Sequence, residues 1–323
     1  MAPTDLIVTG YYRQSPYMSV AGTIEVRPAR RADASRLVAL HAAPGGGPTA
    51  GELSTFNESA FADFVVAARG DEILGACRFI AGSGRCANIL LPRLKEWDEA
   101  LAARLLRAAA ACVNLRSRAR LIQVLIEPQA PPTLVAALEQ AGFERLALLA
   151  YLRRHVRPEE CQAPLPPDLA WRRYWRLRHN RFARTIMATY EDSLDCPGLV
   201  GLRTVDDAIT THKNTGLFTP RAWHLAMADG EPVGVVLLNN VQGRGDVVYL
   251  GVVPAVRHRG IGQALMMRAV GDTAAMGLPQ IGLAVDVANT PAMRLYEKTG
   301  FQETRRRLAY FVPASRLDEL SVP

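Results

Sequence analysis

The chain repeats one order of strands, helices and turns in its two halves. Towards the end of each half the pattern agrees residue by residue, since residues 138–143 read LEQAGF and residues 296–301 read YEKTGF. A β-rich run also ends at a proline in each half, at Pro92 and at Pro254. Internal similarity over so long a period indicates duplicated domains, because solenoid repeats span only about 20–50 residues. We therefore predict two α/β domains in tandem within the 323 residues.

Hydrophobic periodicity and turn residues place the elements of each half. In the first half, strands are expected at 23–27, 64–68, 72–80, 88–91, 121–126 and 143–153, helices at 33–42, 97–115 and 132–141, and a loop at 43–55. In the second half, strands are expected at 170–175, 223–227, 233–238, 247–253, 281–287 and 301–311, helices at 179–190, 205–213, 261–275 and 291–299, and a loop at 192–201.

A proline-rich stretch separates the halves and has the composition of a linker. We accordingly divide the chain into an N-terminal extension (1–22), a first domain (23–157), the linker (158–168) and a second domain (169–323).

Composition narrows the class of protein. The chain is 49% hydrophobic and 21% charged, as globular proteins are, and it has no uncharged apolar run of about 20 residues. Its N-terminus lacks the apolar run of a signal peptide. The five cysteines form no C-x-x-C pair, which argues against a zinc site or a disulfide framework. We expect a cytoplasmic protein with reduced thiols, no bound metal and no membrane contact.

Basic charge is the one feature that suggests nucleic acid. The net charge is +7, carried by 35 Arg and 3 Lys, and the densest basic stretch runs from Arg172 to Arg184. No nucleic-acid reading motif accompanies it, so no nucleic-acid partner is expected. Binding of a duplex through this stretch remains an alternative, which would show a steep loss of affinity with salt.

The most informative segment is residues 252–265, VVPAVRHRGIGQAL. A buried strand enters a turn with two glycines, and an apolar helix follows at once. This arrangement directs backbone N–H groups and the positive end of the helix at one place, while Gly260 and Gly262 allow a ligand close to the backbone. It predicts a diphosphate-binding turn, with Arg257 and Arg259 adding positive charge. An ordinary strand-to-helix turn is the alternative, because neither the Walker A nor the dinucleotide-binding spacing is present.

A second segment, residues 289–301 (NTPAMRLYEKTGF), follows the next buried strand. Together the two segments resemble the GNAT superfamily of acyl-CoA-dependent N-acetyltransferases. The first is similar to its R/Q-x-x-G-x-G/A turn, and the second matches its N-x-x-A-x-x-L-Y-x-x-x-G-F pattern at every position. The resemblance covers the second half and only faintly the first. It implies an α/β fold (an α+β mixed sheet) of two tandem GNAT-like domains, each with a mostly antiparallel central sheet flanked by helices. The tandem arrangement is similar to that of the mycothiol synthases.

The resemblance also implies a site for acetyl-CoA, the expected acyl donor. Val252 and Val253 would pair with the pantetheine arm, the amides from Arg257 to Gln263 would hold the pyrophosphate, and Asn289 would contact the pantetheine or acyl region. The implied coenzyme-binding residues are Val252, Val253, Arg257, His258, Arg259, Gly260, Ile261, Gly262, Gln263, Asn289 and Tyr296. Tyr296 would lie beside the sulfur and protonate the leaving thiolate. A tyrosine that only packs on the helix face is the alternative.

Acyl transfer also needs a base to take the proton of the amine, and two places compete for this role. Asp246 precedes Arg257 by eleven residues, a separation similar to that of the glutamate base in histone-type members. Strand alternation would put it on the face of Val248, Leu250 and Val252; a solvated turn residue is the alternative.

The rival place is the loop 190–197, in which Glu191, Asp192 and Asp195 could bind or deprotonate a cationic amine. Simple solvation of a helix end is the alternative there. Cys196 would form an acyl-enzyme only with an activating partner, and none is adjacent.

The first half has lost the motif. Aligning Pro92 with Pro254 puts Lys95, Asp98 and Ala100 at the positions of the turn, and acidic residues would face a diphosphate. Leu138 stands in the place of Tyr296. We expect one active domain and one supporting domain without coenzyme.

The sequence thus predicts an N-acetyltransferase whose C-terminal domain moves an acetyl group to a primary amine of a small molecule or peptide, by direct attack in a ternary complex. The proposed catalytic residues are Tyr296, Asp246 and Glu191. A non-catalytic acyl-CoA-binding sensor or scaffold is the alternative. The acceptor, the acyl chain length and the choice between monomer and homodimer stay open.

Overall fold

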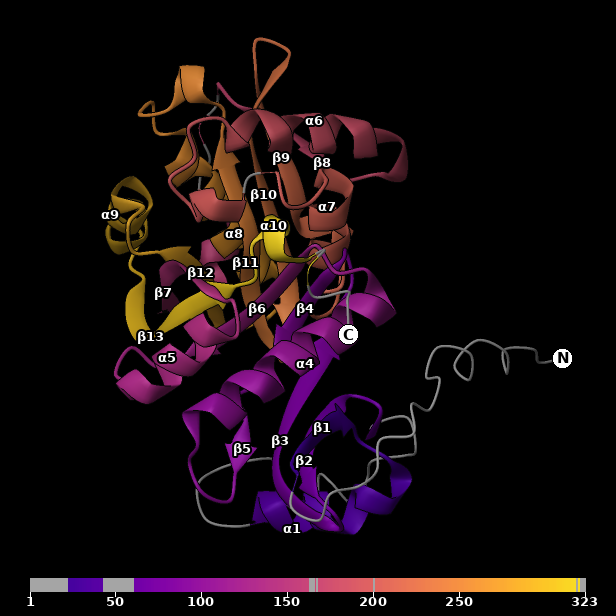
Figure 1. Ribbon diagram of the computed structural model, residues 1–323. Coiled ribbons are helices and arrows are strands. Elements are labelled where there is room, and N and C mark those ends of the chain that lie inside the picture. The colour runs from indigo at the N-terminus through magenta and orange to yellow at the C-terminus, as the bar shows by residue number, and fades with distance from the viewer. Residues whose placement is uncertain are drawn as a thin grey trace, which may run out of the picture.

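A computed structural model describes residues 23–42, 61–162, 166, 168–199, 201–317 and 319. The loop expected at 43–55 therefore lies outside the described residues, and so do the extension 1–22 and part of the linker. Two bodies, each a sheet with helices against it, are joined by a pair of long strands (Figure 1).

The first half contains the following elements: β1 (Glu25–Pro28), α1 (Ala34–Ala42), β2 (Phe64–Arg69), β3 (Glu72–Ala81), β4 (Cys86–Ile89), β5 (Arg93–Leu94), α4 (Glu99–Ser117), β6 (Leu121–Ile126), α5 (Pro132–Gln140) and β7 (Glu144–His155). A 3-10 turn, η2 (Pro158–Gln162), follows.

The second half contains β8 (Ala170–Arg173), η3 (Arg176–Arg178), α6 (His179–Tyr190), α7 (Val205–Lys213), β9 (Trp223–Ala228), β10 (Glu231–Val241), β11 (Arg244–Val252), η6 (Pro254–Val256), α8 (Ile261–Ala275), β12 (Gln280–Asp286), α9 (Thr290–Lys298), β13 (Gln302–Phe311) and α10 (Ala314–Leu317). Most bounds agree with the sequence expectation within two residues. The short β5 was not expected.

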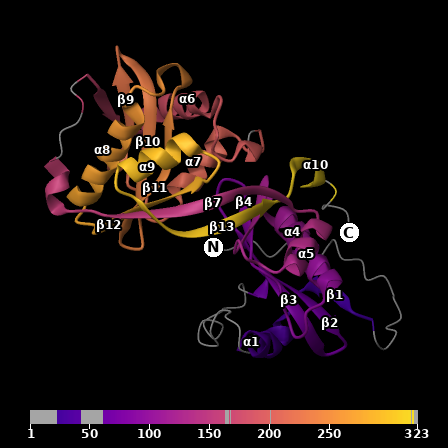
Figure 2. The same ribbon diagram turned by 90° about the vertical axis from the view of Figure 1, so that its left-hand side faces the viewer.

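The two halves share their last strands. The strand order is β1-β2-β3-β4-β6-β13-β7-β12-β11-β10-β9-β8, so β13 of the second half lies between β6 and β7, and β7 of the first half lies between β13 and β12. Figure 2 shows both strands crossing from one body to the other. The sequence predicted each strand but not this exchange. Only β4–β6 and β11–β12 are parallel, so the sheet is mostly antiparallel, as expected.

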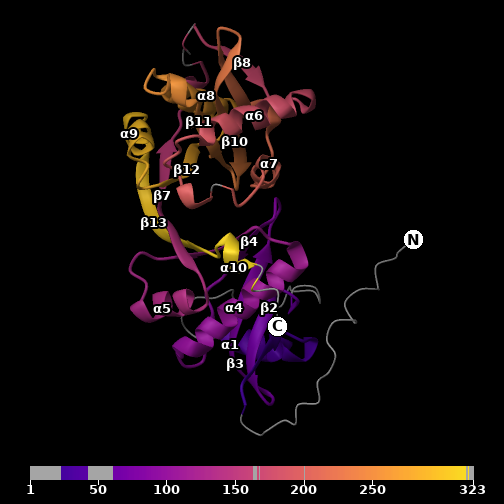
Figure 3. The same ribbon diagram turned by 45° about the horizontal axis from the view of Figure 1, so that its top comes forward.

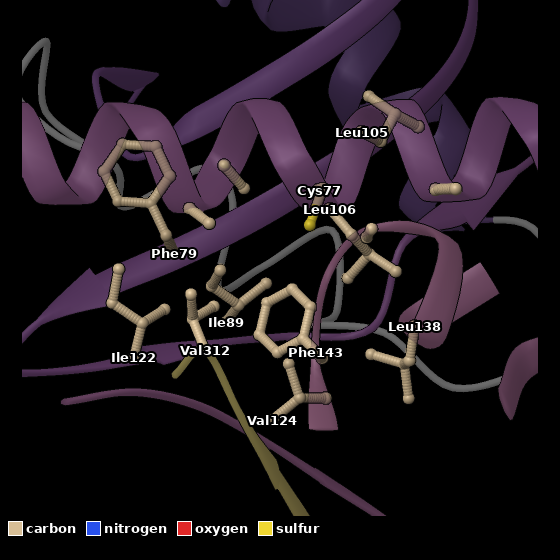
Figure 4. Packing of buried hydrophobic residues seen from close by; sticks show 14 of the residues in the cluster. Cys77, Phe79, Ile89, Leu105, Leu106, Ile122, Val124, Leu138, Phe143 and Val312 are labelled. Atoms are coloured by element: carbon tan, nitrogen blue, oxygen red, sulfur yellow. The ribbon is translucent and has the colours of Figure 1, made fainter. Parts of the chain in front are cut away.

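The hydrophobic cores follow the exchange. In the core of the first half, α4 covers the sheet and Phe79, Leu106 and Phe143 interdigitate (Figure 4). Tyr310 and Val312, from the end of the chain, belong to the same core. Conversely, Ala150 and Leu152 of β7 pack in the core beneath α8 and α9. Burial of apolar side chains therefore holds each half to the last strand of the other.

The end of the described chain returns to the first half. Figure 3 shows α10 beside α4, where the Asn114 side chain donates to the backbone oxygen of Leu317 (3.0 Å). A second junction lies at the β3–β4 turn: Arg85 forms an ion pair with Asp207 on α7, and the Thr211 hydroxyl donates to the oxygen of Ser83 (3.0 Å). These contacts place the first half against α7, next to the loop that follows α6.

Candidate active site

The central feature of the second half is an unpaired edge of β11. This strand pairs with β10 up to Val252, but it pairs with the parallel β12 only at Gly245 and Asp246. From Val247 onward no described strand occupies the other edge, and residues 248–253 stay partly accessible although the strand is central. An extended chain can add to such an edge through main-chain hydrogen bonds.

The turn that follows β11 leads into α8, whose first turn has no side-chain cap. Gly260 is the N-cap of α8, has φ +81°, and no side chain hydrogen-bonds to the first turn. A Cβ at Gly260 would meet nothing within 4 Å, so space is open in front of the helix. The first amides of a helix lack internal partners and carry partial positive charge. The turn therefore presents backbone N–H groups that have no partner within the helix.

Arg257 has a different task from the one expected. Its guanidinium donates to the backbone oxygens of Thr189 (3.2 Å), Glu191 (2.6 Å) and Asp192 (3.0 Å), and its Nε donates to the oxygen of Val252 (3.1 Å). Those carbonyls belong to the end of α6 and to the end of β11, so Arg257 joins α6 to the coenzyme turn. The guanidinium keeps its positive charge beside the turn while its N–H groups bind these carbonyls.

The second motif forms the helix α9. Asn289 is its N-cap, and the side-chain oxygen accepts from the N–H of Ala292 (3.3 Å). Tyr296 lies on the buried face, 7% exposed, against the core beneath α8. Burial raises the pKa of the Tyr296 hydroxyl, and the charge of Asp195 raises it further. A phenol in this setting keeps its proton at neutral pH.

Asp195 is the carboxylate whose charge acts on the Tyr296 hydroxyl. It accepts a hydrogen bond from the backbone N–H of Asp286 at the end of β12 (3.1 Å). Asp195 as a residue is exposed, but burial of its carboxylate raises the pKa of that group, and the charge of Asp286 raises it further. A carboxylate that is hemmed in but reachable by solvent is suited to accept a proton.

The neighbours of Asp195 are mostly aromatic. The Tyr249 hydroxyl shares a 2.7 Å hydrogen bond with the Thr189 hydroxyl, and its ring lies 5.7 Å from those of Tyr190 and His212. Burial, followed by the nearby charge of Arg203, lowers the pKa of His212 to about 4, so this imidazole is neutral at pH 7.

The structure places the other two predicted carboxylates, Asp246 and Glu191, apart from Asp195. Asp246 sits where β11 and β12 are still paired, opposite Gly282, about 13 Å along the strand from Asp286. Its carboxylate accepts from Arg244 at 3.0 and 3.2 Å. Glu191 is exposed at the end of α6, and its backbone oxygen binds Arg257.

The face predicted for Asp246 is only partly right. A register shift at Val248 makes two successive residues of β11 face the α6 side, so Asp246 shares a face with Val248. Leu250 and Val252 point to the α8 side instead. Strict alternation fails here because a β-bulge adds one residue to the strand.

Cys196 follows Asp195 in the same loop and is buried, at 9% exposure. Burial raises the pKa of its thiol, and the neighbouring carboxylates of Asp195 and Asp286 raise it further. Its N–H donates to the Asp286 carboxylate (3.4 Å). A thiol in this environment is a poor nucleophile.

Three residues stand out more in the structure than in the sequence. From the sequence, Asp195 was one of three loop acids, and Asp286 and Tyr249 were not singled out. A polar residue ending the buried run 281–286 was the only sequence signal for Asp286, which is 4% exposed. Within the ranges that the structure describes, no cluster of three metal-binding side chains occurs. No helix there has the length and apolarity needed to cross a membrane.

In the first half, the start of the corresponding helix, α4, is capped by a side chain of the chain itself. Asp98 is the N-cap of α4, and its carboxylate accepts from the N–H of Leu101 (2.9 Å). A carboxylate there takes up an amide and repels a phosphate. This supports the expectation that the first half holds no coenzyme.

Known proteins resemble the chain in the same region. Residues 186–301 match the acetyltransferase (GNAT) family. A mycothiol acetyltransferase of Streptomyces avermitilis is 34% identical over 115 residues, which cover 35% of this chain and 36% of that protein. Another, of Streptosporangium roseum, is 46% identical over 57 residues, 18% of this chain and 17% of that one. The matches thus span about a third or less of these relatives.

Solved structures extend the likeness in fold over most of the chain. A GCN5-related N-acetyltransferase of Sphaerobacter thermophilus has a TM-score of 0.57 at 18% identity, covering 89% of this chain and 95% of that one. A fungal GCN5-related glucosamine N-acetyltransferase region has a TM-score of 0.56 at 14% identity, covering 90% of this chain and 38% of that one. The chain therefore has a GNAT fold over most of its length, and residues 186–301 of its second half match the GNAT acetyltransferase family.

Proposed function

We propose that the second half transfers an acetyl group from acetyl-CoA to a primary amine of a small molecule or peptide, by direct attack while both are bound. The single observation that carries this proposal is the juxtaposition of the unpaired β11 edge, the uncapped start of α8 and Tyr296. The matches to mycothiol acetyltransferases support acetyl transfer as the reaction.

The residues present fit the coenzyme. A pantetheine arm carries amides that can pair with the free edge at residues 247–252, and a pyrophosphate suits the amides from Gly260 onward. The open space at Gly260 leaves room for it. When bound, acetyl-CoA supplies an activated acyl carbon and a thiolate leaving group.

Asp195 and Tyr296 divide the proton transfers. The Asp195 carboxylate takes a proton from the ammonium group, and the freed nitrogen attacks the acyl carbon. A C–N bond forms, the C–S bond breaks, and the Tyr296 hydroxyl gives its proton to the departing sulfur. The second proton lost by the nitrogen goes to solvent. Among Asp195, Asp246 and Glu191 we prefer Asp195 as the base because of its place between β12 and Tyr296.

The test is release of free thiol with a panel of primary amines at saturating acetyl-CoA. Asp195→Asn should lower kcat about 10²–10⁴-fold, the usual worth of a general base, and the rate should recover as pH rises and more amine is neutral. Tyr296→Phe should lower kcat without altering coenzyme affinity. Asp246→Asn and Glu191→Gln serve as matched controls and should keep the wild-type rate.

Other outcomes would change the assignment. A large loss in Asp246→Asn with an active Asp195→Asn would move the base to β11. Tight acetyl-CoA binding without thiol release for any amine would instead support a non-catalytic acyl-CoA sensor.

A further inference from the structure

A cavity lies at the far edge of the sheet in the second half of the chain. It has a volume of about 470 Å³ and is lined by Trp171, Arg172, Arg173, Arg178, His224 and Arg268; we call it the arginine pocket. It is built by β8, the last strand of the sheet, with β9 and α8. Three strand spacings separate β8 from β11, about 14 Å, so the pocket does not belong to the coenzyme edge.

The charge of the arginine pocket is strongly positive. Arg172, Arg173, Arg178 and Arg268 line it, and the only carboxylate paired with any of them in the described contacts is Asp272, 3.4 Å from Arg268. Arg172, Arg173 and Arg178 are exposed and carry no described ion pair. Guanidinium groups converging on a concavity are the usual means of binding phosphate.

His224 gives the pocket a built interior. It is fully buried, and its Nε2 lies 2.6 Å from the Asp272 carboxylate, while its Nδ1 has no hydrogen-bond partner among the described residues. A buried polar atom without a partner is costly. The Nε of Arg268 lies 3.3 Å from the same Nε2, so the imidazole ties Arg268 and Asp272 together at the base of the pocket.

Trp171 forms the apolar wall. The Arg268 guanidinium stacks over its ring at 5.7 Å, and the His224 ring meets its edge at 6.1 Å. The stacking fixes the direction of Arg268, so this guanidinium needs little reorganisation to bind an anion.

We propose that the arginine pocket binds a small molecule carrying a phosphate or diphosphate group, at a site separate from the coenzyme. A nucleic acid is less suited, because the basic stretch does not form a continuous track. Arg173 lies opposite His224 at the pocket, whereas Arg181 donates to the oxygen of Gly230 (3.0 Å).

Pyrophosphate is the probe, and calorimetric titration of the full chain at constant ionic strength is the measurement. The double variant Arg173→Gln/Arg178→Gln should bind it about tenfold more weakly or worse, the effect of losing one charge-assisted hydrogen bond. Arg176→Gln is the matched control, since Arg176 is an exposed arginine of the same stretch that does not line the pocket. It should bind as the wild type does, and circular dichroism should show both proteins folded.

Four results would overturn the proposal. In the first, the wild type does not bind pyrophosphate. In the second, Arg176→Gln loses as much affinity as the double variant, which would indicate a diffuse basic surface. Alternatively, Gly260→Asp abolishes the binding or acetyl-CoA competes with it, which places the anion at the coenzyme turn. Finally, affinity for oligonucleotides rises with their length and falls steeply with salt, which identifies a nucleic-acid surface. None of these results depends on acetyl transfer.

Discussion

Substituting Gly260 by aspartate tests the coenzyme turn, and the chain offers a close control. Gly230, in the β9–β10 turn, has the same φ of +81° as Gly260, and a Cβ at either position would meet nothing within 4 Å. The backbone strain of an aspartate, about 1 kcal/mol, should therefore be equal at the two sites. Only at Gly260 does the new carboxylate face the start of α8.

The two variants should differ sharply in their response to ligand. At a hundred times its dissociation constant, acetyl-CoA adds about 2.7 kcal/mol to the stability of a protein that binds it. For a chain of this size that is a rise in melting temperature of about 5 °C. A carboxylate about 4 Å from one phosphate charge costs about 4 kcal/mol at an effective dielectric constant of about 20, enough to abolish the response.

The assay is thermal denaturation with and without acetyl-CoA, at a concentration fixed from the wild-type dissociation constant. Gly230→Asp should melt slightly below the wild type and still gain about 5 °C. Gly260→Asp should melt equally low and gain nothing. If Gly260→Asp keeps the full gain, the turn does not hold the diphosphate, and the reading of α8 as its anion site is refuted.

Three further substitutions test the junction and the core. Gly84→Ala should lower the free energy of unfolding in urea by about 2–4 kcal/mol, because Gly84 has φ +65° and a Cβ there would overlap the backbone oxygen of Asp207. Gly70→Ala is the control: Gly70 has φ +56° but lies in open space, so the loss should be only about 1 kcal/mol. The Arg85 guanidinium holds the pKa of Asp207 at about 2 against an ordinary 3.8. The ion pair therefore contributes to the stability of the fold above the ordinary pKa, and this contribution is lost as pH falls through about 2. In acid titrations, the melting temperature of the wild type should fall more steeply than that of Asp207→Asn. Asn239→Ala should lower the free energy of unfolding by about 3 kcal/mol or more in the same assay. The buried Asn239 side chain accepts from the Trp223 indole N–H at 2.9 Å and donates to two backbone carbonyls, all of which would lose their partner. If replacing an exposed asparagine by alanine cost as much, the loss of these buried hydrogen bonds would not be the reason.

Local patterns in the sequence predicted most elements because they depend on local chemistry. The turn at Gly260 and the helix at Asn289 need only a strand, two glycines and a capping side chain, all visible in the residues themselves. The strands β7 and β13 were also visible, but their partners were not. Antiparallel strands with the same alternation can pair within a half or between halves, and only the assembled cores decide between these arrangements.

The site was less predictable for the same reason. Arg257 reads as a phosphate ligand until the end of α6 is placed beside it, where its guanidinium is occupied by backbone oxygens. Asp195 reads as a turn residue until the loop is placed against β12. Both facts belong to tertiary structure, in which segments about 70–90 residues apart meet.

The exchanged strands also set the order in which the protein can be built. The edge of β6, which ends at Ile126, is covered only by β13, which begins at Gln302. At about 5–20 residues per second, a ribosome leaves that edge open for roughly 10–40 s. An open strand edge is a template for aggregation, so the nascent chain should depend on chaperones during this interval. The first half can therefore not be removed without loss to the second, because its strand β7 lies between β13 and β12.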